Sequence, residues 1–414
     1  MKPMKPSFDI SSNFAIYLLL GFLFSINLSI AAGYILFSLL LIVLIVSLLR
    51  GSRIPALPGY FKYFLIFIFF SLVSTLFSIN RIRSLKDNKE FFIFLLIPLV
   101  LAVIDSLKKL KLSLIAVLAS ACVSAVIGIF TALKTGGVSL DYRLHGLTSH
   151  WMTYAGLLML TFIFFFVFSF YEKDKKNKIF LALSLVVILA AILLSLTRSA
   201  WVGIFVAIGI FIIYFRPKIL YAAIPAFIIL GLFLPGSVKS RLVSIFDLHN
   251  ATNQDRVYMV RTALAIAADY PLTGVGPNNI GPVYDRYKPA EAQLSNPHLH
   301  NNFLQVLAER GILGLIAFLL VLIAIFVGLV KGIRRSSGLF KRVFLSAFFM
   351  FIGFLTAGLF EYNFGDSEIK FLLFFFLAIP FIRFPGEVAT GGVKDEVPVR
   401  PAGNNLRMNK GDEQ

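Results

Sequence analysis

Apolar runs of about twenty residues recur along this sequence, and short polar connections separate them. A helix needs ~20 apolar residues to cross the hydrocarbon core of a bilayer, and the runs near residues 33–49, 113–133 and 152–171 reach or approach that length. The hydrophobic fraction is 58%, with 45 Phe among 414 residues, and a soluble domain cannot bury so much apolar surface. The sequence therefore predicts an all-α polytopic membrane protein.

Divided at this length, the sequence gives about twelve transmembrane helices. They are expected near residues 14–31, 33–49, 60–79, 91–105, 113–133, 152–171, 179–196, 200–215, 219–235, 312–331, 343–363 and 368–384. We expect four regions: the first nine helices in residues 1–235, one large loop with short helices in 236–311, the last three helices in 312–384, and a polar, disordered tail in 385–414.

The distribution of Lys and Arg predicts the orientation, because short cation-rich loops tend to stay in the cytoplasm. Alternate connections hold the following groups: Arg50 and Arg53; Lys108, Lys109 and Lys111; Lys173, Lys175, Lys176 and Lys178; Arg216 and Lys218; Arg334, Arg335, Lys341 and Arg342. This register places both termini in the cytoplasm. It places loop 236–311 on the outer side, which is the periplasm if the membrane is a Gram-negative inner membrane.

Charge and cysteine content argue against nucleic-acid binding and against a structure held by cysteines. The net charge of +18 comes from Lys and Arg scattered between apolar runs, whereas a nucleic-acid-binding protein clusters them on one face. The single cysteine, Cys122, lies inside an apolar run, so no disulfide framework or cysteine-based zinc site is expected.

Several cations lie on the predicted outer side. Arg81 and Arg83 follow the third segment, and Arg143 lies in the next outer loop. The preference of cations for the cytoplasmic side is only statistical, so such exceptions can occur. Acidic residues in the loop after the third segment can also neutralise its cations. Arg198 stands in a short connection, SLTRSAW, between two apolar helices. A cation in such a place usually has a partner.

The long polar interval begins with an expected helix. Val257, Val260 and Leu264 recur at three- and four-residue steps over residues 255–269, a pattern that predicts an amphipathic helix lying on the bilayer surface. Arg256 and Arg261 lie on this helix. Guanidinium groups bind phosphate with paired, charge-assisted hydrogen bonds, and the alternative is that both arginines simply reach the lipid headgroup region.

A turn and a second helix follow. Gly274, Gly276 and Pro277 predict a turn with exposed backbone N–H groups, and the apolar spacing predicts that a helix starts near His300 and breaks at Gly311. A neutral imidazole can accept a proton near neutral pH. His300 is therefore either a general base or a helix-capping residue.

These residues also carry a resemblance to a known family. PLTGVGPNNI followed by HLHNNFLQVLAERGILGL resembles the signature region of the O-antigen ligase and polymerase superfamily, with a Pro-Leu-x-Gly-x-Gly turn and a His-Asn-x-x-Leu motif. SLTRSAW around Arg198 and YRLHGLTSHWMTYAG with Arg143 are similar to two further family elements, and Arg256 matches the arginine that opens the helix before the turn. The aromatic residue often found four positions on is Val260 here. The resemblance covers residues 142–315.

The resemblance implies a membrane glycosyltransferase with a GT-C-like fold. Such an enzyme moves a polysaccharide from undecaprenyl pyrophosphate to a sugar hydroxyl of lipid A-core, without a metal or other cofactor. It implies His300 as the general base, Arg198 and Arg256 as ligands of the pyrophosphate, and Arg143 and Arg261 as weaker candidates. His298, Asn301, Arg81 and Arg83 are secondary candidates. One-step displacement with one base inverts the anomeric centre.

Four alternatives stay open on sequence grounds. Within the superfamily, a repeat-unit polymerase and a protein O-oligosaccharyltransferase share these motifs, and the single moderate outer loop favours the ligase. A transporter or flippase of lipid-linked glycan usually carries ionisable residues in mid-helix, and these segments hold almost none. The acidic group of Asp366 and Glu368, with Glu361 nearby, resembles a metal-diphosphate element, although acidic residues at a helix end are more often only solvated.

Overall fold

The structure is a computed structural model that describes residues 12–139, 142–221, 225, 231–232, 234–247 and 249–384. All regular elements among these residues are helices, and no strand occurs among them. The expected ninth helix at 219–235 lies largely outside the described residues, and the expected tail at 385–414 lies wholly outside them.

The helices follow the apolar runs closely. Before the long polar interval they are α1 (Ser12–Ser25), α2 (Ile30–Leu49), α3 (Phe61–Leu76), α4 (Arg81–Asp87), the 3-10 helix η1 (Asn88–Leu95), α5 (Leu96–Val103), α6 (Leu107–Lys134), α7 (Trp151–Ser169), α8 (Lys175–Leu194) and α9 (Arg198–Phe215). After it they are α14 (Asn302–Arg335), α15 (Gly338–Ala357) and α16 (Ser367–Ala378). Within it lie α11 (Gly236–Val243), α12 (Ala251–Asp269) and α13 (Ile280–Tyr287).

Seven of the described helices are long and apolar enough to cross a membrane: α2, α6, α7, α8, α9, α14 and α15. The chain is therefore a helical polytopic membrane protein, but twelve spans are not shown. The expected segment 91–105 is divided between η1 and the eight-residue α5, and α16 has only 12 residues. A 12-residue helix rises ~18 Å, which is less than the ~30 Å hydrocarbon core. Apolar composition alone thus does not distinguish full-length spanning helices from shorter buried ones.

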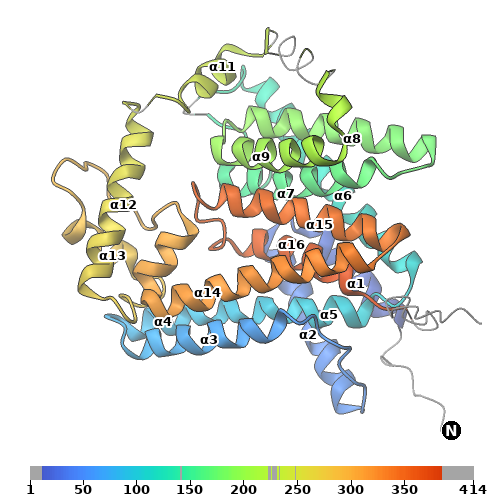
Figure 1. Cartoon of the computed structure of the whole chain (residues 1–414), viewed down its shortest axis with the longest axis horizontal. Coiled ribbons are helices and arrows are strands. Elements are labelled where there is room, and N and C mark those ends of the chain that lie inside the picture. Colours follow the sequence, from blue (N-terminus) through green and yellow to red (C-terminus); the bar gives the residue numbers. More distant parts are fainter. Residues whose placement is uncertain are drawn as a thin grey trace, which may run out of the picture.

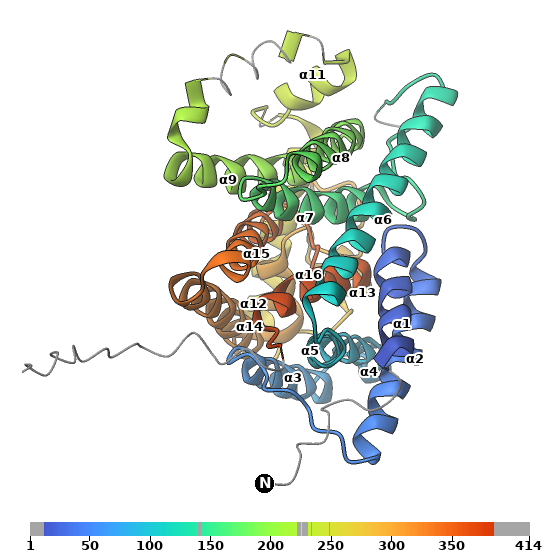
Figure 2. The ribbon, with the colours of Figure 1, turned by 90° about the vertical axis from the view of Figure 1, so that its right-hand side faces the viewer.

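The long helices lie side by side around α16. In Figure 1, α3, α14 and α15 run alongside one another, and α15 also packs against α7 and α9. Figure 2 shows α16 enclosed by the other helices, and its residues from Ile369 to Ala378 are all buried. Between α9 and α15, a Cβ added at Gly203 would lie 2.9 Å from the carbonyl oxygen of Gly353. Small residues permit this close helix contact, as is common in membrane bundles.

Helix α12 crosses one end of this bundle (Figure 1). It begins at Ala251, four residues before the expected start, because Asn250 caps it by accepting a hydrogen bond from the Thr252 N–H. Its buried face is formed by Met259, Thr262, Ala263 and Ile266. The apolar row of Val257, Val260 and Leu264 is exposed on another side of the helix, so α12 presents apolar side chains on two faces.

Candidate active site

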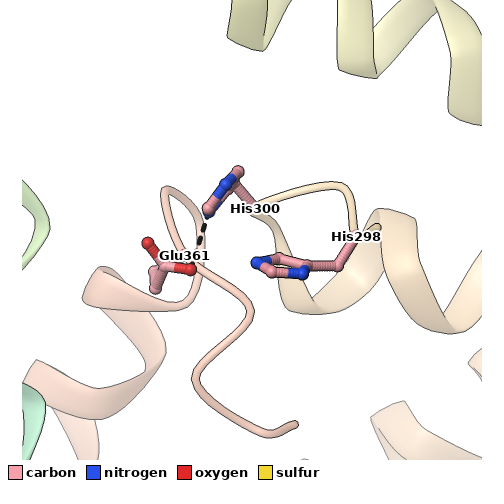
Figure 3. Close-up of side chains that lie close together, drawn as sticks. All are labelled: His298, His300 and Glu361. Carbon is pink, nitrogen blue, oxygen red and sulfur yellow. Dashed lines mark hydrogen bonds and ion pairs between the residues drawn. The ribbon is translucent and has the colours of Figure 1, made fainter. Parts of the chain in front are cut away.

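His300 and Glu361 form a hydrogen-bonded pair at the end of the bundle (Figure 3). Nδ1 of His300 lies 2.7 Å from Oε1 of Glu361, although 61 residues separate them. Glu361 belongs to the link between α15 and α16 and is only 7% exposed. Burial raises the pKa of its carboxyl, but the hydrogen bond and charge of His300, followed by the charge of Arg256, outweigh burial and hold the pKa below its ordinary value. Glu361 is therefore an ionised acceptor for the imidazole.

The two asparagines after His300 hold it against Glu361. The Asn301 side chain caps α14 by accepting from the Phe303 and Leu304 N–H groups, and its amide donates to the Leu359 carbonyl. The Asn302 N–H donates to the Gly358 carbonyl, and its side chain bonds Asn363. The start of α14 is thus tied to the α15–α16 link. His300 itself has a φ of 44°, a left-handed conformation that is uncommon for residues other than glycine and is kept where surrounding contacts enforce it.

His298 lies beside this pair. Its ring centroid is 4.5 Å from that of His300 (Figure 3). Burial, followed by the charge of His300, lowers the pKa of His298 to about 4, so the ring is neutral at neutral pH. Ligand atoms of His298, His300 and Glu361 all lie within 4.8 Å of one another. Two imidazoles and a carboxylate are donors that Zn²⁺ accepts, so among the described residues these three form a group that could hold a metal ion. Asp366 and Glu368, which the sequence offered as an alternative, do not belong to this group.

Four arginines gather near the histidines. We call Arg143, Arg198, Arg241 and Arg256 the arginine cluster. The charges of the other three members act on the Arg198 guanidinium, and those of Arg143 and Arg256 act on Arg241. Burial, followed by those two neighbours, lowers the pKa of Arg241 to about 10. Arg256 also interacts with the Glu361 carboxylate. The cluster therefore adjoins the His300–Glu361 pair and concentrates positive charge there.

Each member of the cluster comes from a different element. Arg198 begins α9 and donates to the Ser244 carbonyl, the Ser244 hydroxyl and the Thr252 hydroxyl. Arg241, from α11, donates to the Leu196 carbonyl. Arg143 precedes α7, and its guanidinium lies 4.9 Å from the Trp151 ring centroid. Arg198 is thus the residue that ties α9 to both ends of the α11–α12 connection.

The other predicted site residues lie apart from this group. Arg261 is exposed on α12. It follows Arg256 by five positions, and at about 100° per residue the two side chains point about 140° apart around the helix. Arg81 is exposed, and Arg83 donates to the Asn278 carbonyl. Asn301 serves as a cap and a tie. The structure thus brings His300, His298, Arg143, Arg198 and Arg256 together and leaves the remaining candidates outside.

The glycine-rich turn has a structural task. The Val275 and Gly276 N–H groups donate to the Ala308 and Glu309 carbonyls, and the Ile312 N–H donates to the Pro271 carbonyl. Helix α14 breaks at Gly311, with φ 63°, as the sequence predicted. A Cβ at Gly311 would lie 2.2 Å from the Leu272 carbonyl oxygen, and one at Gly274 would lie 2.3 Å from the Glu309 carbonyl carbon. The expectation of exposed N–H groups was wrong at Val275 and Gly276. Both groups donate to carbonyls of α14 that the break at Gly311 leaves without a partner within the helix.

A cavity of about 600 Å³ extends into the bundle from His300. It is lined by Phe67, Asp87, Glu90, Phe91, Phe94, Ser149, His150, Trp151, Met152, Thr153, Asn278, Pro297, His298, His300, Gln305, Glu309, Arg310, Glu361, Tyr362, Phe364, Gly365, Asp366 and Lys370. Ion pairs lie within this wall: Arg310 with Glu309 at 2.6 Å and with Asp87 at 3.5 Å, and Lys370 with Glu90 at 2.9 Å. The wall is therefore rich in carboxylates, unlike the neighbouring arginine cluster.

Two site residues were not found from the sequence. Glu361 was grouped with Asp366 and Glu368 as an acidic element, because nothing in the spacing indicates a contact with a histidine 61 positions earlier. Arg241 lies in the polar loop without a motif of its own. Its position on the predicted outer side, shared with Arg143 and Arg198, was the available signal.

The comparisons with known proteins agree with the motifs. Residues 183–319 match the family described as O-Antigen ligase. This segment is about one third of the chain and contains Arg198, Arg241, Arg256 and His300, whereas Arg143 and Glu361 lie outside it. No curated protein matches the chain. Over residues 183–319, the family match confirms the resemblance to the O-antigen ligase family that the motifs carry.

Proposed function

We propose that this protein is an O-antigen ligase, which transfers a polysaccharide from undecaprenyl pyrophosphate to a sugar hydroxyl of lipid A-core. The match of residues 183–319 to the O-antigen ligase family supports a glycosyltransferase of the ligase or polymerase type that uses a lipid-linked glycan. The observation that carries the proposal is the His300–Glu361 pair, 2.7 Å apart, beside an arginine cluster. A base next to fixed positive charge is what attack on a sugar pyrophosphate requires.

His300 is the general base in this proposal. Glu361 accepts a hydrogen bond from the Nδ1–H group of His300, which leaves Nε2 as the basic nitrogen. The acceptor hydroxyl gives its proton to Nε2, and its oxygen forms a bond to the anomeric carbon of the donor sugar. The bond from that carbon to the pyrophosphate oxygen breaks, and the electron pair leaves with undecaprenyl pyrophosphate. Attack opposite the leaving group inverts the anomeric centre.

The arginine cluster stabilises the leaving group. Charge develops on the pyrophosphate as the bond breaks, and fixed cations in a partly buried site stabilise it without reorganising. Arg256 is placed for direct contact, because it also interacts with Glu361 beside the base. Arg198 already makes three hydrogen bonds to Ser244 and Thr252, so it fixes α11 and α12 and adds positive potential. Arg143 and Arg241 complete that potential.

The proposed reaction takes place on the periplasmic side of the inner membrane. The site lies where α7, α9, α14 and α16 begin and α15 ends, with α12 across them (Figure 1). The positive-inside pattern assigns the opposite end to the cytoplasm. A donor lipid in the outer leaflet would then present its pyrophosphate at the level of the arginine cluster.

Transfer in vitro tests this proposal. The full chain in lipid nanodiscs is given undecaprenyl-pyrophosphate glycan and lipid A-core, with and without EDTA. We expect transfer to lipid A-core at the same rate in both conditions, since His300 and the arginines suffice. Loss of transfer with EDTA would instead assign His298, His300 and Glu361 to a metal ion.

A deletion strain separates ligase from polymerase and flippase. Loss of a ligase leaves full-length polymer on the lipid carrier and bare lipid A-core. Loss of a polymerase gives lipid A-core capped with single repeat units, and loss of a flippase leaves the donor on the cytoplasmic side. We expect the first phenotype, and either of the others would contradict the proposed reaction.

A further inference from the structure

The cavity beside His300 is chemically different from the arginine cluster. None of Arg143, Arg198, Arg241 and Arg256 is among the described residues that line it. His298, His300 and Glu361 do line it, and Glu361 also interacts with Arg256. The His300–Glu361 pair therefore lies at the boundary between a cationic region and a carboxylate-rich cavity. A reaction between two substrates at His300 can use the two sides separately.

Two buried polar atoms in the cavity wall have no hydrogen-bond partner among the described residues. They are Oε2 of Glu361 and Nε1 of Trp151. An unpaired buried polar group is costly, and natural sites keep such groups where a ligand or water satisfies them. Glu361 Oε2 needs a donor and the Trp151 N–H needs an acceptor. A sugar hydroxyl supplies both, and an apolar ligand supplies neither.

The charge of the wall restricts what the cavity can hold. Its lining contains five carboxylates, Asp87, Glu90, Glu309, Glu361 and Asp366, but only two cations outside the histidines, Arg310 and Lys370. Both cations are already paired with carboxylates of the wall. A phosphate or carboxylate placed here meets a surplus of like charge, which opposes binding. Neutral hydroxyl groups donate to carboxylates and gain charge-assisted hydrogen bonds.

The apolar part of the wall suits the rest of a sugar. Phe91, Trp151, Tyr362 and Phe364 contribute aromatic rings to the lining. Pockets that bind small molecules combine such apolar surfaces with a few convergent polar groups, and their volumes are about 300–1,000 Å³. The cavity of about 600 Å³ falls in this range.

We propose that this cavity binds the acceptor sugar, and that it selects neutral or amino-bearing sugars over sugars that carry phosphate or carboxylate. The inference rests on the proposed transferase function and names the substrate class of the same site. The acceptor hydroxyl lies between Glu361 Oε2 and His300, and the pyrophosphate of the donor stays on the side of the arginine cluster. The two substrates thus approach His300 from regions of opposite charge.

A kinetic comparison of two tryptophan variants tests the location. Met152 lines the cavity and is partly exposed, so Met152→Trp fills space without changing charge. Leu264→Trp, at an exposed position of α12, is the matched control. We expect Met152→Trp to raise the KM for lipid A-core at least tenfold and to change the KM for the donor less than twofold, with both constants unchanged in Leu264→Trp. A Met152→Trp variant with a raised donor KM and an unchanged acceptor KM would overturn the proposal.

A binding measurement tests the selectivity without transfer. The full chain in nanodiscs, without donor, is titrated with dodecyl glucoside and with dodecyl glucuronide, which differ by a carboxylate. We expect the glucoside to bind at least tenfold more tightly, and Met152→Trp to weaken its binding tenfold. Equal affinities, or glucoside binding that Met152→Trp leaves intact, would overturn the proposal. A wild-type protein that binds glucoside selectively but transfers no glycan would support the cavity while contradicting the transferase function.

Discussion

Asn302 reaches across the site to Asn363: its side-chain Nδ2 donates to the side-chain Oδ1 of Asn363 at 2.6 Å. This contact joins the residue two positions after His300 to the residue two positions after Glu361. The base and its carboxylate partner are therefore held together by the backbone segments that carry them, and not only by their own hydrogen bond. Pre-organisation of this kind lets a base act without a search for its orientation.

Glu361→Gln should slow the chemical step while the donor still binds. The amide of glutamine is neutral, so it stabilises the protonated imidazole less than a carboxylate does. It also permits the tautomer of His300 in which Nε2, and not Nδ1, carries the proton. General base catalysis contributes ~10²–10⁴-fold, and we expect kcat to fall about 100-fold with an unchanged donor KM. Glu361→Asp should recover part of the rate. The matched control is Glu368→Gln, which changes a partly buried carboxyl outside the cavity wall. Equal losses in both Gln variants would argue against a specific role for Glu361.

Arg256 and Arg261 form a matched pair on α12. Arg256 belongs to the arginine cluster and interacts electrostatically with Glu361, whereas Arg261 is exposed. Hydrogen bonds to charged groups contribute about 1.5–3 kcal/mol, so Arg256→Gln should weaken donor binding about 10- to 100-fold. Arg261→Gln should change it less than twofold. Titration with undecaprenyl pyrophosphate in nanodiscs measures both, and a larger effect at Arg261 would show that the pyrophosphate lies on the outer face of α12.

Gly311→Ala should destabilise the fold. The position has φ 63°, and the new Cβ would lie 2.2 Å from the Leu272 carbonyl oxygen. A residue forced into such a conformation costs about 1–3 kcal/mol before any clash is counted. Gly209→Ala on α9 is the control, since no heavy atom lies within 4 Å of its added Cβ. Thermal unfolding in one detergent should show a clear decrease for Gly311→Ala and no decrease for Gly209→Ala; equal melting temperatures would show that the turn does not lock α14.

Asp366 should make the cavity sensitive to pH. Burial raises the pKa of this carboxyl to about 7. The Thr153 hydrogen bond lowers the pKa, and the charge of Glu361 raises it further. The group is neutral below this pH and charged above it, so the cavity gains negative charge as pH rises through 7. Binding of dodecyl glucuronide should weaken several-fold between pH 6 and pH 8, and binding of dodecyl glucoside should not weaken. In Asp366→Asn the decrease should disappear, and a decrease that persists would assign it to another group.

The sequence predicted the class of fold because lipid-facing helices must be apolar along their length. It also predicted that α14 starts near His300, from the apolar spacing, and that it breaks at Gly311, where glycine permits a positive φ. The residue that caps α14 is Asn301, next to His300. The number of full-length helices could not be predicted. Apolar side chains buried in the middle of the bundle, as in α16, have the same composition as those that face lipid.

Two of the outer cations singled out in the sequence lie near the histidines in the structure. Arg143 and Arg198 stood out as outer cations, and the structure places both in the arginine cluster. Glu361 could not be identified, because its role depends on a contact with His300 that only the tertiary structure creates. Arg256 and Arg261 looked alike in the sequence, and the angle between them around α12 distinguishes them.

The most direct test of the account is glycan transfer by His300→Ala. The purified variant is compared with the wild type and with His249→Ala, which alters an exposed histidine outside the cavity wall. We predict that His300→Ala inserts, binds undecaprenyl-pyrophosphate glycan with near-wild-type affinity and shows no detectable transfer, while His249→Ala transfers normally. Transfer by His300→Ala at a rate within a few-fold of the wild type would contradict the assignment of His300 as the base.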